Sequence, residues 1–146
     1  MFVLRLRNLP ELAGPCGPEP WYIEVGAEDD PVDVVARLSS NLLGAPLLVH
    51  STSWRRARGS VILTFVVVIG EDQAPELAGI PVGRTELARS AATQAPEVIA
   101  HGQVLEHGLR HLAWLAKDDE VVRDLLSENW KRVLGGYQPE PFRHLP

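Results

Sequence analysis

Three histidines, His101, His107 and His111, have the spacing most typical of metal ligands in this 146-residue chain. His107 and His111 are four residues apart, so on a helix they share a face from which two imidazoles can bind one zinc ion. At about 100° per residue, His101 falls on the apolar side of that helix instead. A third ligand would have to come from His50, His144 or a carboxylate elsewhere. A metal-dependent hydrolase with His107 and His111 as ligands is therefore one alternative, but we assign no metal and no cofactor.

Aromatic and cationic side chains gather at the end of one predicted strand. The cluster offers an imidazole, an indole for stacking and two guanidinium groups that bind carboxylates or phosphates, and its residues are His50, Ser51, Ser53, Trp54, Arg55 and Arg56. The alternative interpretation of these residues is a polar strand face with a solvated turn. Our candidate ligand-binding residues are Arg37, His50, Trp54, Arg55 and His101. The expected ligand is a small anion or a nucleotide-like molecule.

The chain contains no pattern typical of nucleophilic catalysis. Cys16, the only cysteine, lies in a proline-rich stretch, and there is neither a G-x-S-x-G elbow nor a glycine-rich phosphate loop. Glu97 and Glu106 are predicted to be surface charges of a helix rather than general bases. We therefore assign no catalytic residue and favour a binding protein over an enzyme.

The amino-acid composition disfavours nucleic acid and membranes as partners. A net charge of −5 disfavours non-specific attraction to nucleic acid, although twelve of the fourteen cations are arginines. No apolar run reaches the roughly 20 residues that a membrane-spanning helix needs, and the first residues lack the pattern of a signal peptide. A single cysteine forms no internal disulfide, which is compatible with the cytoplasm. We predict a cytoplasmic α/β protein with one domain over residues 1–146, in which residues 135–146 form an extended tail.

The predicted sheet is built around residues 61–69, whose sequence VILTFVVVI favours a central strand covered on both faces. Residues 2–6 alternate between apolar and charged side chains, which predicts an edge or half-exposed strand. Residues 9–20 carry four prolines and are predicted to be an irregular loop. Further strands are expected at residues 21–25, 47–54 and 80–83, with a basic turn at residues 55–59.

Helices are predicted at four places. Asp30 is a good N-cap and Pro31 a good first residue for a helix that ends near Leu43, before Gly44. A brief helix is expected over residues 86–90 and the longest one from Pro96 to about residue 117. A final helix is expected from about residue 119 to the two glycines at 135 and 136.

The order of these elements resembles the Nudix fold, an α/β/α sandwich around a mixed sheet, over about residues 2–115. In the Nudix box, G-x5-E-x7-R-E-U-x-E-E-x-G-U with U apolar, the arginine would be Arg37 and the second glycine Gly44, and this spacing matches. The glutamates that bind magnesium in that family are replaced here by Leu38, Asn41 and Leu42, so the implied metal site is absent. The resemblance therefore implies a Nudix-like domain that binds a ligand without hydrolysing it.

A third hypothesis is a structural or interaction subunit. Trp114, Trp130 or the tail at residues 139–146 would then pack on a partner, which in one version is a second copy in a homodimer. Neither a nucleic acid nor a membrane is an expected partner. The sequence thus leaves a small-ligand binder, a metal-dependent hydrolase and an interaction subunit as competing hypotheses.

Overall fold

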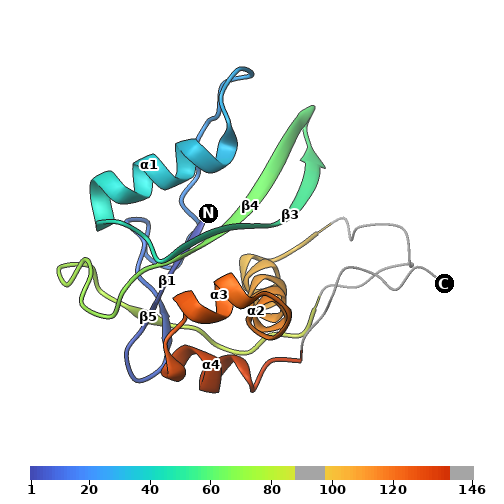
Figure 1. Cartoon of the computed structure of the whole chain (residues 1–146). Coiled ribbons are helices and arrows are strands. Elements are labelled where there is room, and N and C mark those ends of the chain that lie inside the picture. Colours follow the sequence, from blue (N-terminus) through green and yellow to red (C-terminus); the bar gives the residue numbers. More distant parts are fainter. Residues whose placement is uncertain (88–97, 139–146) are drawn as a thin grey trace. The chain divides into compact units, whose positions relative to one another are not determined.

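The middle strand of the sheet is the first element of the chain. The computed structural model (Figure 1) describes residues 1–87 and 98–138. Its five strands lie in the order β3-β4-β1-β2-β5. β1 (Phe2–Leu6) pairs in parallel with β4 (Ser60–Val68) and antiparallel with β2 (Pro10–Leu12), which in turn pairs antiparallel with β5 (Ile80–Pro81). The sheet is mixed, and the prediction of an α/β fold is confirmed.

β1 is not the edge strand that its alternating pattern predicted. All five of its residues are buried, and the side chain of Arg5 is 0% exposed. The charged position misled the prediction because the hydrogen-bond partners of Arg5 lie inside the protein. β4, which was predicted to be central, lies between β1 and β3 and is buried only from Thr64 onward.

Two neighbouring segments also differ from the prediction. Residues 10–12, inside the predicted loop, form β2, whereas residues 21–25, predicted to be a strand, contain no strand although all of them are described. Trp21 exchanges two backbone hydrogen bonds with Met1, at 2.6 and 2.8 Å, but the pairing does not continue as a ladder. A strand needs a neighbour along its whole length, and residues 21–25 lack one in the described sheet.

α1 (Pro31–Leu43) has the bounds that the sequence predicted. The Asp30 carboxylate accepts hydrogen bonds from the backbone N–H groups of Val32 at 2.7 Å and Asp33 at 3.4 Å. Gly44 ends the helix with a φ of 83°, a conformation that favours glycine. Both ends of α1 are thus set by residues within a few positions of them.

Asp30→Ala is expected to lower the free energy of unfolding by about 1 kcal/mol, because two N–H groups at the start of α1 would lose their acceptor. The urea midpoint measures this loss. Asp29→Ala is the matched control, since it removes the same charge one residue earlier without removing the cap. Equal midpoints for the two variants would contradict the prediction.

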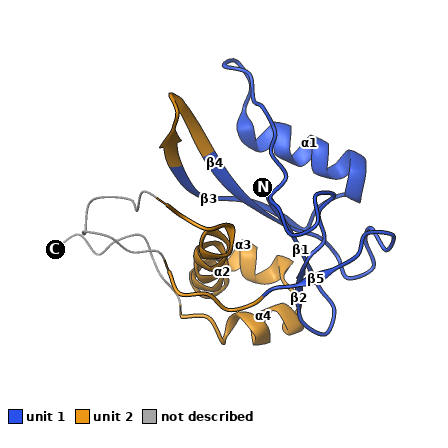
Figure 2. Cartoon of the chain, turned by 180° about the vertical axis from the view of Figure 1, so that it is seen from behind, with its two compact units in different colours: residues 1–54, 63–82 blue, residues 55–62, 83–146 orange. Residues whose placement is uncertain are grey.

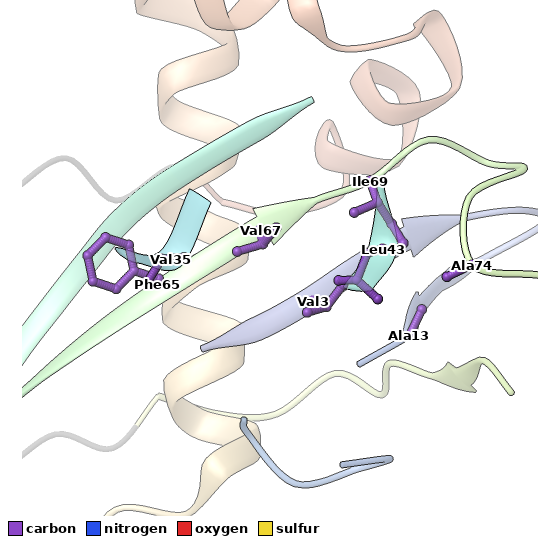
Figure 3. Close-up of a cluster of buried hydrophobic side chains, with 8 residues drawn as sticks. All are labelled: Val3, Ala13, Val35, Leu43, Phe65, Val67, Ile69 and Ala74. Carbon is purple, nitrogen blue, oxygen red and sulfur yellow. The ribbon is translucent and has the colours of Figure 1, made fainter. Parts of the chain in front are cut away.

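The described chain forms two compact units, residues 1–54 with 63–82 and residues 55–62 with the chain from 83 onward (Figure 2). The prediction of one domain stays a prediction. In the first unit, α1 packs Val35 and Leu43 against the sheet residues Val3 and Val67 (Figure 3). The buried cluster consists of Val3, Ala13, Val35, Leu43, Phe65, Val67, Ile69 and Ala74.

The second unit contains α2 (His101–Asp118), α3 (Glu120–Leu125) and α4 (Glu128–Leu134), and α2 packs against both shorter helices. The single final helix of the prediction is divided, because Ser127 caps a new helix by accepting a hydrogen bond from the N–H of Trp130. Residues 86 and 87 are not helical. The predicted helix start at Pro96 and the tail at 139–146 lie outside the described residues.

None of the helices in the described part of the chain combines the length and apolar character that crossing a membrane requires.

Candidate functional site

A tight hairpin carries the predicted cluster around Trp54. β3 (Leu48–Ala57) joins β4 through Arg58 and Gly59, whose φ values of 48° and 82° are both positive. Two such residues form a type I′ turn, the connection that suits the twist of paired strands. The turn is therefore shorter than the predicted residues 55–59, and Arg55 still belongs to the strand.

The two-residue turn sets the register of the hairpin, placing Arg56 opposite Val61 and Trp54 opposite Leu63 on one face. Trp54 is 67% exposed, Val61 58% and Leu63 40%. Further along β4 the same face carries Phe65, which is buried in the cluster that includes α1. We call the exposed set Trp54, Arg56, Val61 and Leu63 the hairpin strip.

The predicted ligand residues are only partly brought together. Successive side chains of a strand alternate, so of the two arginines in the predicted cluster Arg55 points to the face of β3 opposite Trp54 and Arg56 shares the face of Trp54. His50 lies on the same strand and is half-buried. Arg37 is exposed on α1, and His101 is the first residue of α2.

The hairpin is a positively charged element in an acidic chain. Residues 48–69 contain three arginines, Arg55, Arg56 and Arg58, and no aspartate or glutamate. Within residues 1–87 and 98–138, none of the three forms an ion pair. The hairpin therefore carries a net positive charge of its own.

The histidines of α2 form a ring cluster. The rings of His107 and His111 lie edge to face with centroids 6.5 Å apart, and His111 packs on Trp114 with centroids 5.6 Å apart. Among the residues that the structure describes, no three His, Cys, Asp or Glu side chains are grouped closely enough to hold a metal ion. His144 lies outside these residues, so the metal-dependent hydrolase stays a hypothesis without structural support.

Glu106 is buried, which corrects its prediction as a surface charge. Its carboxylate accepts hydrogen bonds from Arg84 Nε at 3.2 Å and Nη2 at 3.1 Å, from Arg110 Nε at 2.9 Å and from the N–H of Thr85 at 3.4 Å. Arg84 also donates to the Gly136 carbonyl at 2.9 Å. The pair Glu106 and Arg110 has helix i,i+4 spacing, which is the one sequence signal that could have revealed this network.

The charges of this network support ion pairing rather than acid–base catalysis. Burial disfavours the ionised carboxylate, but the Arg84 and Arg110 donors outweigh it, and the pKa of Glu106 lies below its ordinary value of 4.5. The hydrogen bond to Glu106 correspondingly raises the pKa of Arg84. The Arg84 guanidinium also lies 4.1 Å from the centre of the Tyr137 ring, a cation–π contact. We infer that Glu106 ties α2 to residues 84–85 and, through Arg84, to residues 136–137.

Arg5 forms a second buried network that the sequence did not reveal. It donates from Nε to Glu11 Oε1 at 2.5 Å, from Nη1 to the carbonyls of Gln73 at 2.9 Å and Ala74 at 2.7 Å, and from Nη2 to that of Leu77 at 2.9 Å. Ala74 has a φ of 48°, a left-handed conformation that costs a residue with a Cβ about 1–2 kcal/mol. Arg5 therefore anchors the loop after β4, and its donors are used within the fold.

Comparisons with protein families, with curated proteins and with solved structures found no match to this chain. The Arg5 and Glu106 networks pair their charges within the fold, whereas the hairpin strip presents an aromatic ring and a cation to solvent. The hairpin is the best candidate for a binding site.

Proposed function

We propose that this chain is a binding protein that recognises an anionic partner through the exposed end of its β3–β4 hairpin. The observation that carries the proposal is Trp54, 67% exposed beside Arg56 on a strand pair with no acidic residue. Tryptophan and arginine are the side chains most enriched at binding hot spots. An exposed indole beside a cation can stack on a planar group while the guanidinium pairs with its carboxylate or phosphate.

The proposal covers the small anionic or nucleotide-like ligands that the sequence analysis expected. A base would stack on Trp54 and a phosphate would pair with Arg56, with Arg58 adding charge at the turn. The Nudix-like fold stays a hypothesis. Its hydrolytic chemistry has no support, since Leu38, Asn41 and Leu42 stand on α1 where carboxylates would be needed, and Asp33 is the one acidic residue of that helix.

Calorimetric titration of nucleotides, sugar phosphates and acidic peptides tests this function. Arg56→Gln is expected to weaken the best ligand at least about tenfold, because a hydrogen bond to a charged group contributes about 1.5–3 kcal/mol net of exchange with water. Trp54→Ala is expected to weaken it to a similar degree.

Arg132→Gln, which removes an exposed arginine from α4, is the control and should leave affinity unchanged. Absence of binding across the whole panel, or an equal loss in the Arg132 variant, would refute the small-ligand form of the proposal.

A further inference from the structure

Residues 21–30 combine a strand-like sequence with an acidic end. Trp21–Val25 reads WYIEV, rich in residues that favour strands, yet it forms no strand in the described sheet. Val25 is 38% exposed and Glu24 is exposed. Three more exposed carboxylates follow, Glu28, Asp29 and Asp30. This segment therefore offers β-forming residues and four negative charges at the surface.

β3 is an edge strand of the sheet that the described residues form. It stands at one end of the strand order, with β4 as its neighbour in the described sheet, and it is 10 residues long. The opposite edge, β5, has only 2 residues and ends in Pro81. Natural proteins protect long edges with prolines, charged side chains (lysine above all) or bulges, because free N–H and C=O groups there can pair with another chain. β3 contains neither proline nor lysine.

We propose that two copies of the chain associate by strand addition, with residues 21–25 of each copy pairing with the β3 edge of the other. This inference rests on the proposed function, because the anionic partner of the hairpin would then be the acidic segment of a second copy. A mutual exchange of this kind closes into a two-fold dimer.

Charge complementarity selects the second copy as the occupant. Residues 21–30 carry four carboxylates and no cation, and residues 48–69 carry three arginines and no carboxylate. Arg55 and Arg56 point to opposite faces of β3, so an added strand meets a guanidinium on either of its faces. Pairing would also cover Trp54 and Val25, which are exposed in the single chain.

Sedimentation of the full chain over a wide range of concentration tests the inference. The wild type is expected to dimerise, and Arg56→Glu and Glu24→Arg are each expected to be monomeric at concentrations where the wild type is a dimer. An equal mixture of the two variants should recover dimers, since both contacts of the mixed pair again join opposite charges. Glu120→Arg, at an exposed position of α3, is the control and should stay dimeric.

The results separate this inference from the proposed function. A wild type that stays monomeric, or variants that do not restore dimers when mixed, would overturn the inference. A monomeric wild type that binds the nucleotide or peptide panel through Arg56 would uphold the proposed function alone. The second copy would be identified as the anionic partner by two results together. The mixture of the two variants forms dimers, and the monomeric Glu24→Arg variant alone binds no small ligand. A wild type that stays monomeric and binds no member of the panel would refute both proposals.

Discussion

Arg5→Met is expected to destabilise the protein by about 3–5 kcal/mol, the range for removing one partner of a buried ion pair. The variant would leave the Glu11 carboxylate, 14% exposed, without its closest cation. The carbonyls of Gln73, Ala74 and Leu77 would lose their donor in a part of the loop that cannot take up bulk water freely. Arg5→Lys keeps the charge but cannot reach all four acceptors, so its loss should be intermediate.

Urea unfolding measures these losses, and amide hydrogen exchange of residues 70–79 shows where they act. Arg7→Met is the matched control, because Arg7 is 44% exposed and its Nε lies 3.8 Å from the same Glu11 oxygen. Exchange in the loop should accelerate in the Arg5 variants and stay unchanged in the Arg7 variant. If Arg5→Met and Arg7→Met unfolded at the same urea concentration, Arg5 would not anchor the loop.

Glu106→Gln is expected to cost about 2–3 kcal/mol at neutral pH, because the amide keeps the shape of the side chain and removes the charge that compensates two guanidinium groups. The expected loss is smaller than for Arg5 because Arg84, at 53% exposed, can be solvated once its partner is neutral. Glu128→Gln is the control, since that carboxylate is 83% exposed in its pair with Lys131 and should contribute little.

The pH dependence of the stability difference between the wild type and Glu106→Gln tests the direction of the pKa shift of Glu106. The folded pKa of Glu106 is lowered, so its stabilisation is fully present above the unfolded value near 4.5 and is lost as pH falls through the folded value. The wild type should therefore lose its advantage over Glu106→Gln as the pH drops below about 4.5, and keep it unchanged between neutral pH and that point. An advantage that grew on acidification would contradict the assigned direction of the shift.

The local sequence predicted part of the candidate site. Trp54 and the basic hairpin were predicted because a buried strand, a turn glycine and clustered arginines follow one another directly in the chain. Which of the two neighbouring arginines shares the face of Trp54 could not be read from the sequence, since strand alternation has to be counted from a turn whose length of two residues only the structure shows. His101 and Arg37 share neither that strand nor that turn.

By itself the sequence determined α1 and the hairpin, because an N-cap, a terminal glycine and a two-residue turn act over a few positions. Only the tertiary structure decided that β1 is central and that residues 21–25 stay outside the sheet, since strand order depends on distant pairing. The burial of Arg5 was equally invisible, because its carbonyl partners lie 68 to 72 positions away. A charged residue is predicted to lie at the surface when only its sequence neighbours are known, because acceptors from a distant segment become visible only in the folded structure.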